Sequence, residues 1–67
     1  MITLQVNGQA LRVSAPITAA QLIEQLALGG KRVALERNGE IVPKSLLPQQ
    51  SLEDGDSLEI VAAVGGG

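Results

Sequence analysis

Apolar and polar residues alternate at the start of the chain. From Ile2 to Val6 every second residue is apolar, and this period of two is typical of a strand with one buried face. Asn7-Gly8 follows, and both residue types tolerate the positive φ angles of a two-residue hairpin turn. The pattern therefore predicts a hairpin whose second strand covers residues 9–13 and ends at Ser14-Ala15-Pro16.

The period then changes to that of an amphipathic helix. Thr18 and Gln21 have the spacing of a capping box, in which each side chain bonds the other residue's backbone amide. The apolar stripe that follows consists of Leu22, Ile23 and Leu26. Gly29-Gly30 is expected to end the helix, and the stripe is expected to cover the apolar face of a sheet.

A second hairpin is predicted from Val33 to Val42, with Asn38-Gly39 as its turn and Pro43 at its end. The stretch from Lys44 to Leu52 has no clean period and contains a proline, which predicts a loop with one helical turn. We expect its leucines to pack beneath the sheet; they are Leu46, Leu47 and Leu52.

Alternation returns in a final strand over residues 58–63, after the acidic turn Glu53-Asp54-Gly55-Asp56. We interpret that turn as solvated, because it lacks the ligand spacing of a calcium loop. Two hairpins, one helix and a last strand predict an α+β chain with the β-grasp (ubiquitin-like) fold, a mixed four- to five-stranded sheet with the helix across one face. Residues 1–63 form this domain and residues 64–67 a flexible glycine tail.

Composition excludes several functions. The 67 residues contain no cysteine and no histidine, which removes the commonest thiol nucleophile and the commonest general acid or base, and leaves no thiolate metal site. With no aromatic residue and a net charge of −2, the chain has neither stacking platforms nor a basic patch for nucleic acid. No apolar run is long enough to cross a bilayer, so we expect a cytoplasmic protein that is monomeric when free.

The group with distinctive chemistry is the α-carboxylate of Gly67, at the end of Val64-Gly65-Gly66-Gly67. Glycine has no Cβ to clash in a narrow channel, so this segment could enter the active site of a partner enzyme. Val61 and Ala63 are predicted to form a small apolar patch beside it, and with Val64 they are the candidate partner interface. A flexible terminus or a linker scar is the alternative interpretation.

Four stretches, in this order and in a chain of this length, give the sequence its resemblance to a known family. They are Ile2 to Val6 with Asn7-Gly8, Leu35 to Pro43, Asp54-Gly55-Asp56, and Val64 to Gly67. Together they resemble the ThiS family of sulfur carrier proteins in thiamine biosynthesis, and the resemblance spans essentially the whole chain.

The resemblance implies a protein substrate with no cofactor of its own, rather than an enzyme. An E1-like (ThiF-like) adenylyltransferase would activate the Gly67 carboxylate, and sulfur from a cysteine desulfurase-derived persulfide would convert it to a thiocarboxylate. A ThiG-like thiazole synthase would then take the sulfur, with Gly65, Gly66 and Gly67 inserted in the partner active sites. The alternatives are a carrier like the small subunit of molybdopterin synthase, a ubiquitin-like modifier, and a β-grasp interaction module with an inert tail.

Overall fold

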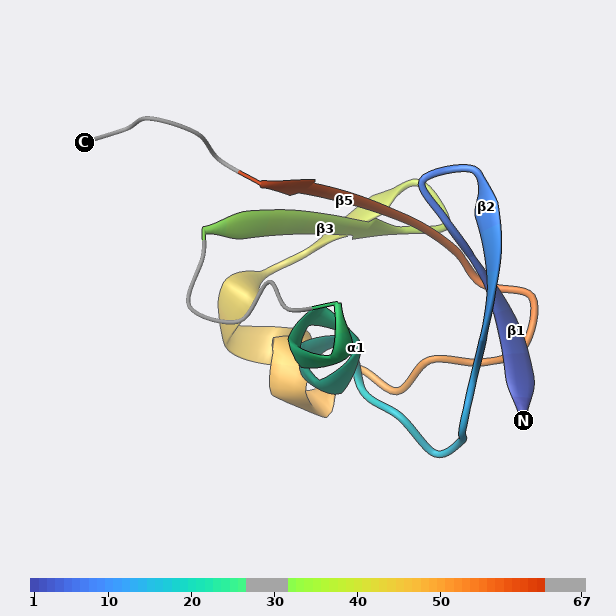
Figure 1. Cartoon of the computed structure of the whole chain (residues 1–67). Helices are drawn as coiled ribbons and strands as arrows, with labels where there is room; N and C mark the ends of the chain where they lie inside the picture. Colours follow the sequence, from blue (N-terminus) through green and yellow to red (C-terminus); the bar gives the residue numbers. More distant parts are fainter. Residues whose placement is uncertain (27–31, 63–67) are drawn as a thin grey trace.

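The computed structural model describes residues 1–26 and 32–62 and consists of one five-stranded sheet with helices on one side (Figure 1). The elements in chain order are β1 (Ile2–Val6), β2 (Gln9–Val13), α1 (Ala19–Gln25), β3 (Val33–Arg37), β4 (Glu40–Val42), the 3-10 helix η1 (Lys44–Gln49) and β5 (Ser57–Ala62). The predicted order of elements is confirmed, and the loop after β4 contains η1.

The strand order across the sheet is β2-β1-β5-β3-β4. The two hairpins are antiparallel, while β5 lies between them, parallel to β1 and antiparallel to β3. The sheet is therefore mixed, and α1 packs across one face of it, which confirms the predicted β-grasp class (Figure 1). The strand that comes last in the sequence, β5, therefore occupies the centre of the sheet.

Both hairpin turns have the backbone that their sequence predicts. Asn7 and Gly8 have φ angles of 51° and 84°, and Asn38 and Gly39 have 52° and 88°. Two consecutive positive φ values match the right-handed twist of the flanking strands and suit asparagine followed by glycine.

The core is aliphatic and draws on every layer of the fold. Its four most deeply buried large side chains are Leu4, Leu22, Leu35 and Leu58, one each from β1, α1, β3 and β5. With no aromatic ring available, these leucines supply the apolar burial on which a chain of this size depends.

Helix α1 begins as predicted and ends earlier than predicted. The amide of Gln21 donates to Thr18 Oγ1 at 3.2 Å, and the amide of Thr18 donates to Gln21 Oε1 at 2.8 Å, so the capping box is present. We expected Gly29-Gly30 to end the helix, but its last residue is Gln25, because Leu26 adopts a ψ of 7° and caps the C-terminus. Residues 27–31, with both glycines, lie outside the described residues.

The leucines after β4 were not all assigned correctly. Leu47 and Leu52 are buried as expected, but Leu46 is 46% exposed, and its prediction was wrong. The reason is the three-residue turn of η1, which cannot direct two consecutive side chains to the same side. Leu52 reaches the core because the chain at 50–52 bonds the entry to α1, where Leu52 N donates to Ile17 O at 3.0 Å.

Candidate functional site

Strand β5 leads toward the predicted functional tail, and the side chain of Asn7 fixes it from the β1 side. Regular pairing of β1 with β5 covers two residue pairs, Gln5 with Ser57 and Val6 with Leu58. Asn7 then continues the ladder: its Nδ2 donates to Ile60 O at 3.1 Å and its Oδ1 accepts from Ile60 N at 2.8 Å. The side-chain amide of Asn7 thus makes the two hydrogen bonds to Ile60 that a backbone peptide would make if the β1–β5 pairing continued.

The second turn asparagine fixes the beginning of β5. The amide of Asn38 donates to Ser57 O at 2.8 Å, and Asn38 Oδ1 accepts from Ser57 N at 2.9 Å. Sequence reasoning identified both asparagines as turn residues and missed this second role. The signal that was available is the repeated Asn-Gly pair, since glycine alone would satisfy the backbone of either turn but could not bond a third strand.

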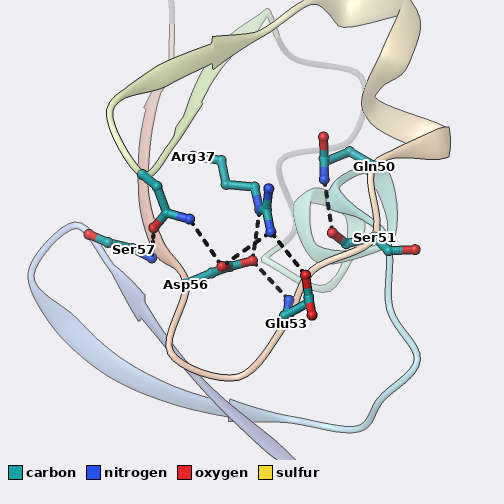
Figure 2. A network of polar contacts seen from close by, with 7 residues as sticks. Arg37, Gln50, Ser51, Glu53, Asp56 and Ser57 are labelled. Carbon is teal, nitrogen blue, oxygen red and sulfur yellow. Dashed lines mark hydrogen bonds and ion pairs between the residues drawn. The ribbon is translucent and has the colours of Figure 1, made fainter.

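Asp56, immediately before β5, is the centre of a polar network (Figure 2). Its Oδ2 accepts from Arg37 Nε at 2.8 Å and from the amide of Glu53 at 2.8 Å. Its Oδ1 accepts from Asn38 Nδ2 at 3.1 Å and from Arg37 Nη2 at 3.3 Å. The turn was expected to be solvated, and for Asp56 this is wrong: the residue is 6% exposed because four donors compensate its burial.

The network determines the charge of both partners. Burial alone would raise the pKa of Asp56, but hydrogen bonds from Arg37, the Glu53 amide and Asn38, with the guanidinium charge, hold that pKa below its ordinary value. The hydrogen bond to Asp56 raises the pKa of Arg37 against the opposing effect of desolvation. The ion pair therefore stays charged at neutral pH and attaches the start of β5 to β3.

Of the candidate interface residues, Val61 is the one whose side chain the structure describes. It is 63% exposed and lies on the face of the sheet opposite α1, as its alternation with the buried Leu58 and Ile60 requires. Ala63, Val64 and the glycines Gly65, Gly66 and Gly67 lie outside the described residues, as does the expected domain boundary after residue 63. Their roles remain predictions.

The same face carries apolar residues that the sequence did not single out. Ala34 is directly opposite Val61 in the β3–β5 pairing and is exposed. Ile41 of β4 is 68% exposed and is paired with Glu36 of β3. Exposed apolar side chains thus lie on all three strands from β5 to β4.

Residues 1–26 and 32–62 hold no group of three histidine, cysteine or acidic side chains arranged to bind a metal. Among the helices of these same ranges, none combines the length and apolarity required to span a membrane.

Comparison with known proteins gives a consistent match. A family model described as the ThiS family matches residues 4–67. The sulfur carrier protein ThiS of Escherichia coli is 34% identical over 61 residues, which cover 91% of this chain and 92% of that protein. The crystal structure of a thiamine biosynthesis protein (ThiS) from Geobacter metallireducens superimposes with a TM-score of 0.82 at 28% identity, covering 98% of this chain and all of that one.

A longer relative also matches. A thiazole synthase of Paramagnetospirillum magneticum is 48% identical over 64 residues, which are 96% of this chain and 20% of that protein. The chain thus spans about a fifth of the length of this relative.

Proposed function

Because this chain belongs to the ThiS family, sulfur carriers of thiamine biosynthesis, we propose that the carboxylate of Gly67 is the group that is activated and loaded with sulfur. The observation that carries the proposal is the extent of the family match, which continues through residue 67 and so includes the glycine tail. The chain acts as a protein co-substrate in the cytoplasm, and partner enzymes perform the catalysis.

Activation begins with the carboxylate, which is a poor electrophile while it is ionised. In the active site of an E1-like (ThiF-like) adenylyltransferase, a carboxylate oxygen attacks the α-phosphorus of ATP, and pyrophosphate leaves. The product is an acyl adenylate whose leaving group is AMP. A glycine at the end of the chain suits this step, because no Cβ hinders the approach of either reactant.

Sulfur is added in the next step. The terminal sulfur of a cysteine desulfurase-derived persulfide attacks the carbonyl carbon and displaces AMP. A second thiol then cleaves the sulfur–sulfur bond, becomes oxidised to a disulfide with the former persulfide cysteine, and releases the Gly67 thiocarboxylate.

The acceptor that we propose is a thiazole synthase. A relative of that name contains a segment 48% identical to this chain, which supports a shared pathway. The thiocarboxylate would supply the sulfur of the thiazole ring, and the carboxylate would return for another cycle.

The test is the intact mass of the protein before and after incubation with ATP, the adenylyltransferase, a cysteine desulfurase and cysteine. We expect a mass gain equal to one oxygen replaced by one sulfur, confined to the C-terminal peptide. The matched control is the chain without Gly67, which should gain no mass and should keep its free energy of unfolding within about 0.5 kcal/mol, as expected for a change that removes no side chain from the core. An unchanged mass of the full chain, in a system that loads the Escherichia coli carrier, would contradict the proposal.

A further inference from the structure

Both hairpin turns of the sheet carry asparagine followed by glycine, a dipeptide with a reaction of its own. The backbone nitrogen of the residue after an asparagine can attack the side-chain amide carbon, and glycine has no Cβ to hinder that approach. Gly8 and Gly39 are both exposed, and a Cβ added at either position would meet nothing within 4 Å. Neighbouring residues therefore do not crowd either turn.

The reaction converts the asparagine into an acidic residue. In the first turn, the Gly8 nitrogen forms a bond to Asn7 Cγ, the bond from Cγ to Nδ2 breaks, and the Gly8 proton leaves with Nδ2 as ammonia. The product is a five-membered succinimide ring. Water then opens the ring at one of its two carbonyl carbons, which gives aspartate or isoaspartate. The net change replaces an NH group by oxygen and needs only water.

The hydrogen bonds that the two asparagines make to the β5 region oppose this reaction. Asn7 Nδ2 donates to Ile60 O at 3.1 Å, and Asn7 Oδ1 accepts from Ile60 N at 2.8 Å. Asn38 Nδ2 donates to Asp56 Oδ1 at 3.1 Å, and Asn38 Oδ1 accepts from Ser57 N at 2.9 Å. Ring formation expels Nδ2 and makes the planar amide carbon tetrahedral, so each asparagine has to release its partners before it can react.

The two asparagines are held with unequal strength. Asn7 follows a β1–β5 pairing of two residue pairs, and its side chain bonds neutral backbone groups. Asn38 follows a β3–β5 pairing of five residue pairs, and one of its bonds goes to the buried carboxylate of Asp56. Hydrogen bonds to a charged group are roughly twice as strong as those between neutral groups. Release is therefore easier at Asn7.

We propose that Asn7 and Asn38 are sites of spontaneous deamidation, that each reacts only after it releases the β5 region, and that Asn7 reacts first. The inference does not depend on sulfur loading. The reaction cannot be undone by closing the contact again, because aspartate has no donor to replace Nδ2. At position 7 a carboxylate oxygen then faces the Ile60 carbonyl, and at position 38 it faces the Asp56 carboxylate. Each product holds β5 less firmly than asparagine does.

The experiment follows deamidation of the full chain in mildly alkaline buffer, folded and in urea, by peptide mass after digestion. Trypsin places the two asparagines in separate peptides, residues 1–12 and 38–44. In urea we expect similar rates at both sites, because the dipeptides are identical. In the folded chain we expect Asn7 to react about five- to a hundredfold more slowly than in urea, and Asn38 about tenfold more slowly still, from the usual strengths of neutral and charge-assisted hydrogen bonds.

D56N tests the charged bond. The variant removes the carboxylate that holds Asn38, so the rate at Asn38 should rise more than the rate at Asn7. E53Q is the matched control, because the Glu53 side chain lies in the same turn, is 78% exposed and bonds Arg37, so both rates should stay unchanged. Hydrogen exchange of the Ile60 amide measures release at Asn7 directly, since Asn7 Oδ1 is its acceptor.

Equal slowing of both asparagines in the folded chain would overturn the proposal, because global unfolding would then expose the two sites together. Faster reaction at Asn38 than at Asn7 would overturn the assigned order. The proposal also fails if Asn7 reacts equally fast with and without urea, since its bonds to Ile60 would then give no protection. It fails as well if Asn7 stays intact in the folded chain while the Ile60 amide exchanges, because release would then not lead to reaction.

Discussion

Replacing Asp56 with asparagine tests whether the network around β5 stabilises the fold. The variant keeps the shape of the side chain, removes its charge and turns one oxygen into a donor that faces other donors. Asp56 accepts four hydrogen bonds, two of them from Arg37, so at least two are lost. Charge-assisted bonds contribute about 1.5–3 kcal/mol each, and breaking a buried ion pair costs about 3–5 kcal/mol.

We therefore expect D56N to lose about 3 kcal/mol of unfolding free energy, at the lower end of that range because the Arg37 side chain is 25% exposed. A domain of this length has a total of roughly 3–10 kcal/mol, so the loss is large. Thermal and urea unfolding measure it, with a fall in Tm of about 12–24 °C. E53Q is the control: Glu53 is 78% exposed and 3.5 Å from Arg37, and its loss should stay below about 0.5 kcal/mol.

The pH dependence gives the result that would refute this reasoning. The folded pKa of Asp56 is lowered, so its contribution is complete above the unfolded value of about 3.9 and disappears as the pH falls through the folded pKa. The difference in stability between D56N and the parent should therefore be constant from pH 7 to about 5 and shrink below about 4. A loss under about 1 kcal/mol at pH 7, or one that is equal at pH 7 and pH 2, would show that the network contributes little through its charge.

Three further predictions concern the tail, the hydrogen bonds from Asn7 to β5 and the helix cap. Gly66→Val should prevent adenylation while leaving the melting curve unchanged, because a β-branched side chain obstructs a narrow channel; normal loading measured by intact mass would refute the steric argument. Asn7→Gly keeps the positive φ of the turn and removes both bonds to Ile60, so urea unfolding should show a loss of about 1–2 kcal/mol, with Gln9→Ala as a control that keeps the turn. Thr18→Ala should cost about 1 kcal/mol in the same assay, and no loss would mean that the capping box does not stabilise α1.

Local sequence signals predicted the elements because each of these signals acts within a few residues. The Asn-Gly pairs specify hairpin turns, and the Thr18–Gln21 spacing specifies the start of α1. The end of α1 differs from its prediction: the helix ends at Gln25 with Leu26 as its cap, whereas Gly29-Gly30 was expected to end it.

Contacts between residues far apart in the sequence could not be predicted from such local signals. Asn7 and Ile60 are 53 positions apart. No repeating pattern in the sequence indicates which backbone group a side-chain amide will bond. Asp56 was assigned to a solvated turn because the turn lacks the ligand spacing of a calcium loop, and only the fold shows that Arg37 of β3 reaches it. Likewise, Glu36 and Glu59 are ordinary surface residues until the register of β3 and β5 places them opposite each other.

The position of β5 limits how a partner can use the tail. Bonds from Asn38 and Asn7 hold the backbone of β5 at Ser57 and at Ile60, so a partner that contacts Val61 would contact a strand whose position is fixed. Gly67 is six positions beyond Val61, and an extended chain covers at most about 3.6 Å per position, or roughly 22 Å. An enzyme that contacts Val61 can therefore adenylate Gly67 only if its ATP site lies within that distance of the contact. Inserting glycines before Gly65 should leave docking intact and lower the adenylation rate at saturating carrier, since a longer arm positions its end less well. A KM that changes in proportion to the insertion, with kcat constant, would show that the tail itself supplies the binding.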